Sequence, residues 1–289
     1  MKRFVFKPRK VPTFSGFNLQ QLLSKDSGTY SLDGSLGKRE LYVSVRIARD
    51  NIYIDNIKIS RDLIRELKKR RLYAIESNNI KPLVEVKDNI LYQLVLFEGC
   101  RTPTLEISGI HMHRVVVDPL FEDSFTKVRV LNPKPRKKVL EICTGLGYST
   151  YWLLKRKCYV VSIEKNETVL KLAEYNPWSS HLENVDIILG DATQAIYDFD
   201  ADSFDYIFHD PPRFSLAPEL YSQDFYEQLF RVLKPRGKIF HYTGTPGEKR
   251  GKYLAKGVAE RLRQCGFWRV KYAESAKGIL AEKPFISSF

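Results

Sequence analysis

The chain has 289 residues, of which 43% are hydrophobic and 12% aromatic, a composition typical of a globular protein. This length accommodates one α/β domain of roughly 150–180 residues and a smaller second domain. No apolar run approaches the roughly 20 residues of a membrane span, and the basic start "MKRFVFKPRK" lacks the apolar core of a secretory signal. The four cysteines are scattered, and no two have metal-ligand spacing; they are Cys100, Cys143, Cys158 and Cys265. We therefore expect no metal site and a protein of the reducing cytoplasm. The lack of a long apolar run leads us to expect no membrane contact.

The formal net charge of +13 indicates the kind of partner. Residues 1–105 hold 20 Lys and Arg against 11 Asp and Glu, whereas residues 106–289 hold 27 against 23. A positive field of this kind attracts polyanions, with nucleic acid foremost. A heat-adapted chain with solvated charge networks also carries many charges, but that reading does not explain a one-sided excess.

The first third of the chain predicts a small β-rich α+β domain over residues 1–105. Residues 41–59 alternate apolar and polar side chains around "RDN", which indicates a β-hairpin. The next segment, 60–72, has Ser60 as a helix cap, apolar residues at helical spacing and a basic exposed face. Residues 82–99 predict two more strands around "KDN". We expect this domain to bind RNA or another substrate.

Two basic clusters and two histidines are candidate substrate contacts. The clusters are "KKRR" (68–71), which includes Arg70 and Arg71, and "KPRKK" (134–138). Each is a candidate phosphate contact, and each alone is also compatible with a solvated face. We assign 106–138 as a linker that adds to the substrate pocket. In it, His111 and His113 can face one side of a strand ahead of Arg114, either as pocket residues or as exposed histidines, and without a third ligand they do not indicate a metal.

From residue 139 onward, strands and helices alternate. Strands alternating with helices of 10–15 residues predict a doubly wound, mostly parallel, Rossmann-like sheet. We count seven strands, the last two antiparallel, in 137–145, 159–164, 184–191, 204–210, 237–244, 268–275 and 278–284. Ligands in such sheets bind at the carboxyl ends of the strands.

Acidic residues lie at or near the ends of the first four strands. Gly145 and Gly147 fall in the turn after the first strand, where glycine lets a ligand approach the backbone closely. Glu164 lies 19 residues after Gly145 at the end of the second strand, where a carboxylate can accept hydrogen bonds from ribose hydroxyls. An acidic rim is therefore predicted at this edge of the sheet, formed by Glu141, Glu164, Asp191 and Asp210. Such a rim suits a cationic, nucleoside-bearing ligand.

The region from Val139 to Pro284, half of the chain, resembles a class I S-adenosylmethionine-dependent methyltransferase. The resemblance implies that Glu164 holds the cofactor's ribose and that Asp191 and Ala192 meet its adenine. It further implies that the methionine end is surrounded by Glu141, Thr144, Gly145 and Gly147. The implied cofactor-binding set also includes Ser149, Thr150 and Lys165.

The stretch "HDPPRF" resembles the Asp/Asn-Pro-Pro-aromatic motif of the amine-methylating branch of this family. Carboxylate and carbonyl oxygens accept hydrogen bonds from an amine, and proline has no N–H to compete for the carboxylate. Asp210, Pro211 and Pro212 are therefore predicted to hold the amine. The motif's fourth position is Arg213 and the aromatic residue, Phe214, follows, so either side chain is a candidate to stack the target base.

A small basic domain before a core with "DPPRF" looks like an archaeal family that makes N4,N4-dimethylcytidine in small-subunit (16S) ribosomal RNA. That resemblance implies a monomeric RNA methyltransferase whose partner is ribosomal RNA or a ribosomal particle. Three alternatives remain open. One is an aminopropyltransferase of the spermidine synthase type, which the segment 220–240 resembles. The others are an RNA methyltransferase acting on guanine N2, and a binding module without chemistry.

Overall fold

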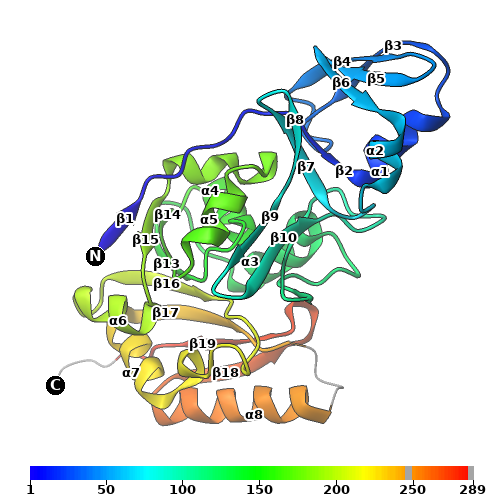
Figure 1. Cartoon of the computed structure of the whole chain (residues 1–289). Coiled ribbons are helices and arrows are strands. Elements are labelled where there is room, and N and C mark those ends of the chain that lie inside the picture. The colour runs from blue at the N-terminus through cyan, green and yellow to red at the C-terminus, as the bar shows by residue number, and fades with distance from the viewer. Residues whose placement is uncertain (245–248, 286–289) are drawn as a thin grey trace. The chain divides into compact units, whose positions relative to one another are not determined.

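The computed structural model describes residues 1–244 and 249–285, which form two compact units (Figure 1). Unit 1 comprises Met1–Val5, Leu120–Glu167 and Asn184–Phe289, and unit 2 comprises Phe6–Pro119 and Thr168–Glu183. Both units are basic: unit 1 holds 27 Lys and Arg against 19 Asp and Glu, and unit 2 holds 20 against 15. The charge excess therefore is not confined to the unit that contains most of the N-terminal third.

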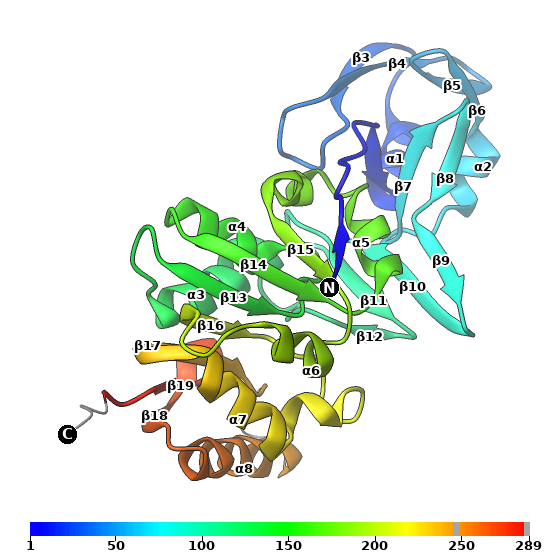
Figure 2. The same ribbon diagram turned by 90° about the vertical axis from the view of Figure 1, so that its left-hand side faces the viewer.

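Unit 1 is built on an eight-stranded sheet with the order β1-β15-β14-β13-β16-β17-β19-β18 (Figure 2). The central strands β15, β14, β13, β16 and β17 are parallel, and β19 and β18 close one edge as an antiparallel pair. The strand bounds are β1 Lys2–Phe4, β13 Lys138–Ile142, β14 Tyr159–Glu164, β15 Asp186–Leu189, β16 Phe204–His209, β17 Leu233–Tyr242, β18 Trp268–Ala273 and β19 Gly278–Glu282. The doubly wound sheet is confirmed, but it has one more strand than the seven predicted.

The additional strand is β1, which pairs antiparallel with β15 so that Lys2 faces Leu189 and Phe4 faces Ile187. Three residues are too few to show the alternating pattern that identifies a strand in a sequence. The backbone hydrogen bonds of β1 cover what would otherwise be an open sheet edge at β15.

Helices pack on both faces of this sheet. They are α3 Phe125–Leu131, α4 Tyr148–Lys155, α6 Ala192–Ala195, α7 Gln223–Val232 and α8 Lys249–Gln264, with short helical turns η2 Pro119–Ser124, η4 Ile196–Asp198, η5 Pro218–Tyr221 and η6 Glu274–Ala276. Two further elements, α5 Glu167–Ala173 and η3 Pro177–Asn184, belong to unit 2 except for one terminal residue each. One core contains Leu229 of α7 and Val258 of α8, and a second contains Val128 of α3 and Leu153 of α4. The central strands β13, β14 and β16 are largely buried on both faces, which explains why they read as continuous apolar runs.

Unit 2 contains three small antiparallel sheets, with orders β3-β4-β5-β6, β2-β7-β8 and β12-β11-β10-β9, and the first two share one apolar core. Its elements are β2 Thr13–Ser15, α1 Gly16–Gln21, η1 Leu22–Ser24, β3 Gly28–Asp33, β4 Tyr42–Ile47, β5 Asn51–Ile54, β6 Ile57–Ser60, α2 Arg61–Glu66, β7 Leu72–Glu76, β8 Asn79–Pro82, β9 Val84–Lys87, β10 Ile90–Val95, β11 Thr104–Ile107 and β12 Ile110–His111. The hairpin predicted in 41–59 is present as β4 and β5, and the pair predicted in 82–99 as β9 and β10.

The helix predicted after Ser60 is also present, because the Ser60 side chain accepts the Leu63 backbone N–H at 3.1 Å. It ends at Glu66, however, so the basic cluster 68–71 lies in the connection to β7 and not on a helical face. Leu67 already has extended backbone dihedrals, which end the helix.

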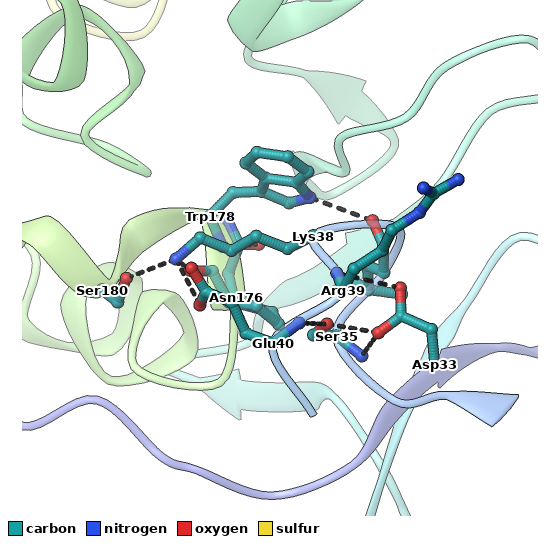
Figure 3. Close-up of polar contacts among 10 residues, drawn as sticks. Asp33, Ser35, Lys38, Arg39, Glu40, Asn176, Trp178 and Ser180 are labelled. Atoms are coloured by element: carbon teal, nitrogen blue, oxygen red, sulfur yellow. Dashed lines mark hydrogen bonds and ion pairs between the residues drawn. The ribbon is translucent and has the colours of Figure 1, made fainter. Parts of the chain in front are cut away.

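The two units are not consecutive stretches of chain. Residues 168–183 belong to unit 2, where Lys38 Nζ donates to Pro177 O at 3.1 Å and to Ser180 Oγ at 2.9 Å (Figure 3). Trp178 Nε1 donates to Leu36 O at 3.0 Å in the same loop contact. The predicted boundaries at 105/106 and 138/139 differ from the observed ones because long-range side-chain contacts, invisible to composition, decide which unit a segment joins.

Across residues 1–244 and 249–285, no helix combines the length and the apolar character that a membrane span requires.

Candidate active site

The carboxyl ends of β13, β14, β15 and β16 meet at one edge of the sheet in unit 1. Strand order reverses at β13, and open α/β sheets bind ligands outside the strand ends at such a point. The turn from β13 into α4 lies here, with positive φ at Cys143 (70°), Gly145 (54°) and Gly147 (71°). A Cβ built on Gly145 meets no atom within 4 Å, so this backbone faces open space that a ligand can occupy.

Four predicted acidic residues converge on Cys143 in this turn. Burial raises the pKa of its thiol well above the usual value, and the charges of Glu164, Asp210, Glu141 and Asp191 raise it further. All four carboxylates lie at or near the carboxyl ends of β13, β14, β15 and β16, which are neighbours in the sheet, so they form one local cluster. Cys143 itself was not predicted as a site residue, since no motif marks a lone cysteine and its positive φ is visible only in the structure.

Glu141 supports the site from inside the sheet. Its side chain is fully buried and accepts hydrogen bonds from Thr150 Oγ1 at 2.5 Å and Ser162 Oγ at 2.6 Å. Burial raises the pKa of Glu141, and hydrogen bonds from Ser149, Ser162 and Thr150 oppose that rise. These hydrogen bonds join β13, β14 and α4 together. The cofactor contacts predicted for Glu141, Ser149 and Thr150 stay predictions. Thr144 joins the same network through Ser162, at 2.6 Å.

Glu164 connects the end of β14 to the glycine turn. Its carboxylate accepts the Gly145 backbone N–H at 3.0 Å and the Asn166 N–H at 2.9 Å. Burial raises the pKa of Glu164, and these backbone donors oppose the rise by stabilising the anion. The carboxylate is thus fixed beside the open backbone at Gly145, as a ribose-binding role requires.

Asp191 caps the N-terminus of α6, accepting the Thr193 backbone N–H at 2.9 Å, and pairs with Lys165 Nζ at 2.8 Å. Burial opposes ionisation of Asp191, but Lys165 and Thr193 outweigh it and lower its pKa. Lys165 is 67% exposed, so this ion pair contributes little stability and can open for a ligand. Ala192, the first residue of α6, is buried beside it.

Asp210 is held by a buried ammonium group. Lys127 of α3 lies between Asp210, at 2.8 Å, and Asp123, at 3.0 Å, and its Nζ lies 3.9 Å from the centre of the Tyr242 ring. The Lys127 side chain is only 2% exposed, whereas Asp210 is 21% exposed and so reaches the surface of the site. Two carboxylates and one ammonium leave this triad with a net charge of −1, and the reachable part of that charge is on Asp210.

The two charged partners affect each other's ionisation. Burial disfavours the charged form of Lys127, but Asp123, Asp210 and Tyr242 outweigh it and raise its pKa. Burial raises the pKa of Asp210, and Lys127 opposes this rise. Lys127 therefore favours the ionised form of Asp210 and orients its carboxylate. Sequence reasoning missed Lys127 and Asp123, because their i,i+4 spacing on a short helix gives no sign of a strand end 83 residues away.

The Asp-Pro-Pro turn is fixed by Tyr221. Its hydroxyl donates to Pro212 O at 2.8 Å, and its ring packs edge-on against Phe214 with centroids 5.4 Å apart. Pro211 is buried, whereas Arg213 is exposed and Phe214 is 46% exposed. Both candidate stacking side chains therefore face solvent, and Phe214 has the more rigid support.

The candidate substrate residues of unit 2 form a separate polar network. His111 Nε2 lies 2.9 Å from Glu106 Oε2, Glu106 accepts from Gln93, and Arg71 donates to Gln93 at 2.8 and 3.0 Å. Arg71 thus has a structural role, and its predicted phosphate contact stays a prediction. The guanidinium of exposed Arg70 lies 4.5 Å from the centroid of Phe97, whose ring also contacts His111.

The remaining residues predicted near the pocket are also in unit 2. His113 Nδ1 lies 2.9 Å from Thr104 Oγ1, and Arg114, like His113, is half-buried. Within the part of the chain that the structure describes, no group of three or more His, Cys, Asp or Glu side chains is arranged to hold a metal ion.

Comparison with known proteins identifies the family. The chain is 41% identical over 272 residues to the uncharacterized protein MJ1233 of Methanocaldococcus jannaschii, an alignment that covers 92% of this chain and 93% of that protein. Residues 139–237 match the model of a methyltransferase domain. This chain belongs to the MJ1233 family, and its core is a class I S-adenosylmethionine-dependent methyltransferase domain.

The methyltransferase core lies in an architecture also found in spermidine synthases. The crystal structure of spermidine synthase from Thermotoga maritima is 18% identical, covers 79% of this chain and 76% of that chain, and has a TM-score of 0.56. A spermidine synthase in complex with the transition-state analogue AdoDATO is 15% identical, covers 91% and 83%, and also has a TM-score of 0.56. At this identity the likeness shows a shared fold.

The cofactor of this methyltransferase is S-adenosylmethionine, and the residues at the sheet edge fit it. The open backbone at Gly145 provides room for a ligand, and Glu164 is fixed beside it as an acceptor for hydroxyl groups. The anionic cluster around Cys143 complements the positive charge of a sulfonium. When bound, the cofactor supplies an electrophilic methyl group for transfer.

Proposed function

We propose that this protein methylates the exocyclic amine of a base in RNA, with N4 of a cytidine in small-subunit ribosomal RNA as the acceptor. The observation that carries the proposal is the position of Asp210, at the carboxyl end of β16, followed by two prolines and oriented by Lys127. Asp210 follows β16 and Glu164 ends β14, the two neighbours of β13 in the sheet, so the amine acceptor and the cofactor's binding residues share one edge of the sheet.

The chemistry follows from the weakness of the nucleophile. The lone pair of a base amine is delocalised into the ring, so holding the nitrogen in line with the methyl group supplies a large part of the rate enhancement. In our proposal, the Asp210 carboxylate and the Pro211 carbonyl accept the two N–H bonds. Pro212 O already accepts from Tyr221, which fixes the turn that presents Pro211. The amine proton is lost after the nitrogen becomes positively charged.

The surroundings of Asp210 favour a neutral acceptor. A diamine substrate carries two positive charges at neutral pH, and the buried ammonium of Lys127 lies 2.8 Å from the carboxylate that would have to bind it. A base amine is uncharged and meets no such repulsion. Exposed Phe214, or Arg213 beside it, then supplies a surface on which the flipped base can stack.

The second candidate is aminopropyl transfer from decarboxylated S-adenosylmethionine. The shared architecture with spermidine synthases over most of the chain favours it. The Lys127 ammonium and the net charge of +13 oppose it, because both disfavour a polycationic substrate. Within RNA, guanine N2 is the other amine to consider. The choice of cytidine rests on the resemblance of "DPPRF" and the preceding domain to the archaeal dimethylcytidine family.

The test compares two substrate pairs with one set of variants. Wild type, Asp210→Asn and Asp210→Ala each receive ribosomal RNA with S-adenosylmethionine, and separately putrescine with the decarboxylated cofactor. We expect methylation of RNA by wild type and a loss on the order of 10²-fold in Asp210→Ala, with Asp210→Asn retaining more because it keeps one acceptor oxygen. Both variants keep the Lys127–Asp123 pair, and calorimetry should show unchanged cofactor affinity.

Mass spectrometry of nucleosides identifies the methylated base and separates cytidine from guanine. Aminopropyl transfer without RNA methylation would overturn the proposal. Full methylation by Asp210→Ala would overturn the assigned role of Asp210 and leave the fold and cofactor unaffected.

A further inference from the structure

A basic surface lies at the edge of the sheet in unit 1 opposite the candidate active site. Three segments meet there: 134–138, which leads into β13, 155–157, which ends α4, and 234–236, at the start of β17. Nine of their eleven residues are Lys or Arg, and none is acidic. Backbone hydrogen bonds connect the first two segments, with Arg136 N–H donating to Lys157 O at 2.8 Å.

The third segment is joined to the first through Asp205. Its carboxylate lies 3.0 Å from Lys137 Nζ and 3.5 Å from Lys234 Nζ. This single acidic side chain neutralises only a small part of the charge of the three segments. Lys134, Arg136 and Lys157 are all exposed, so their charges are available to a ligand.

An exposed aromatic ring lies within this charge. Tyr159, the first residue of β14, is 65% exposed and donates its backbone N–H to Lys137 O at 2.9 Å. In the parallel pairing of β13 with β14 it is the register partner of Lys138. Because the Tyr159 ring is mostly exposed, it contributes little to the packing of unit 1. We call the basic residues of the three segments, together with Tyr159, the amino-edge patch.

We propose that the amino-edge patch binds single-stranded RNA, with the cations contacting phosphates and Tyr159 stacking on a base. Sites for single strands combine these two features, a positively charged track and an aromatic platform. The inference rests on the proposed RNA substrate and extends it, because the patch is separated from the catalytic turn by the length of β13. At about 3.3 Å per residue that strand spans roughly 15 Å, so one RNA contacts both edges only if it passes around the sheet.

The patch suits RNA better than a lipid surface. Membrane-surface segments carry large apolar side chains that insert below the headgroups. The amino-edge patch instead presents one tyrosine, whose flat ring and hydroxyl match a base better than an acyl chain. We therefore treat anionic membrane as the alternative outcome of the test.

The experiment measures binding without catalysis. A fluorescein-labelled uridylate oligomer of about 20 nucleotides, longer than a typical single-strand site, is titrated by anisotropy between about 50 and 200 mM salt. The patch variant is Lys134→Gln with Lys157→Gln, and the matched control is Lys256→Gln with Lys271→Gln, which removes two exposed lysines elsewhere in unit 1. We expect the patch variant to bind more weakly and its log–log salt slope to fall by about 1.4, while the control keeps the wild-type slope.

Tyr159 is tested by its own pair of substitutions. Tyr159→Ala should weaken binding about fivefold or more without changing the salt slope, since stacking releases no counterions, and Tyr159→Phe should retain wild-type affinity. Wild-type binding by the patch variant, or an equal loss in the control, overturns the inference. If the patch variant loses binding to phosphatidylserine vesicles but keeps wild-type RNA binding, the inference is overturned in favour of a membrane contact.

The two proposals fail in different ways. If wild type methylates no RNA but the patch variants still change oligomer binding, the proposed function is wrong and the patch stands. If RNA is methylated and oligomer binding does not depend on the patch, the proposed function stands and the patch is a solvated face.

Discussion

At the scale of single residues, the contacts of Lys127 with Asp123 and Asp210 determine how the Asp210 carboxylate is oriented. An ammonium that is 2% exposed and lies within 3.0 Å of both Asp123 and Asp210 is costly to remove, because the buried carboxylates are then left unpaired. The same contact fixes the direction in which Asp210 points. The acceptor oxygens at the strand end are therefore positioned before any substrate binds.

Lys127→Met should reveal this role in two measurements. Urea denaturation should show a loss of about 3–5 kcal/mol in the free energy of unfolding, the scale for breaking a buried ion pair. With Lys127 gone, Asp123 and burial both raise the pKa of Asp210, so methyl transfer should fall at low pH and recover as pH rises. Lys127→Arg keeps the charge and serves as control. A pH–rate profile identical to wild type would contradict the assignment.

Glu164 is the residue on which cofactor affinity should depend most. It is fixed by the N–H groups of Gly145 and Asn166 beside the open backbone of the glycine turn. Glu164→Ala should weaken S-adenosylmethionine binding by roughly 1.5–3 kcal/mol, the scale of lost hydrogen bonds to a charged group. Calorimetry of Glu219→Ala, a more exposed carboxylate that also neighbours Lys165, provides the control. Equal affinities for wild type and Glu164→Ala would remove Glu164 from the cofactor site.

At the scale of elements, the turn after β16 depends on η5 for its shape. Tyr221 lies at the end of η5 and ties its hydroxyl to Pro212 O, while its ring supports Phe214. The prolines fix two φ angles, but the tyrosine fixes the turn relative to the rest of the core. The short helical turn η5 thus helps to fix the backbone of the Asp-Pro-Pro turn.

Tyr221→Phe should loosen this turn without unfolding the protein. The substitution keeps the buried ring and removes one hydrogen bond, so we expect a stability loss of about 1 kcal/mol. The turn would be held less firmly, which should lower the rate of methyl transfer to RNA while S-adenosylmethionine affinity stays at the wild-type value. A variant with wild-type kcat would show that the prolines alone hold the turn.

At the scale of the whole molecule, two buried histidines make stability depend on pH. His209, next to Asp210, and His241 are fully buried with ring centroids 4.3 Å apart. Burial lowers the pKa of His209 to about 4, and burial together with His209 lowers the pKa of His241 well below its usual value. Both rings are therefore neutral in the folded protein at pH values where the unfolded chain binds protons.

The sign of the effect follows from these depressed pKa values. Stability from His209 is fully present above pH 6.5, the unfolded pKa, and is lost as pH falls from 6.5 toward 4. The loss from His209 alone should reach about 2 kcal/mol at pH 5. Glu141, Glu164 and Asp210 act in the opposite direction because their pKa values are raised. The measurement is therefore the difference in unfolding free energy between pH 7 and pH 5, for wild type against His209→Phe.

His209→Phe removes one titrating ring, so stability should fall less on acidification in the variant than in wild type. The comparison cancels the contribution of the carboxyl groups common to both proteins. An equal pH dependence in the two proteins would show that His209 does not bind a proton on unfolding in this range.

Much of unit 1 is determined by local sequence. Its parallel strands are apolar runs that alternate with helices, and both patterns arise from which side chains must be buried. The acidic strand ends were predictable for the same reason, since parallel strands place their carboxyl ends together once the alternation is recognised. Glu164 and Asp210 could therefore be assigned to one site from their positions in the chain.

The tertiary structure alone decided which distant groups meet. Lys127 reaches Asp210 across 83 residues, Tyr221 closes on Pro212, and residues 168–183 leave the core to join unit 2. It also placed Glu141 in the interior, where the carboxylate accepts hydrogen bonds from Thr150 and Ser162. Such contacts depend on side-chain directions and packing between separate elements. A sequence read residue by residue records the chemistry of each side chain but not the partner that folding places beside it.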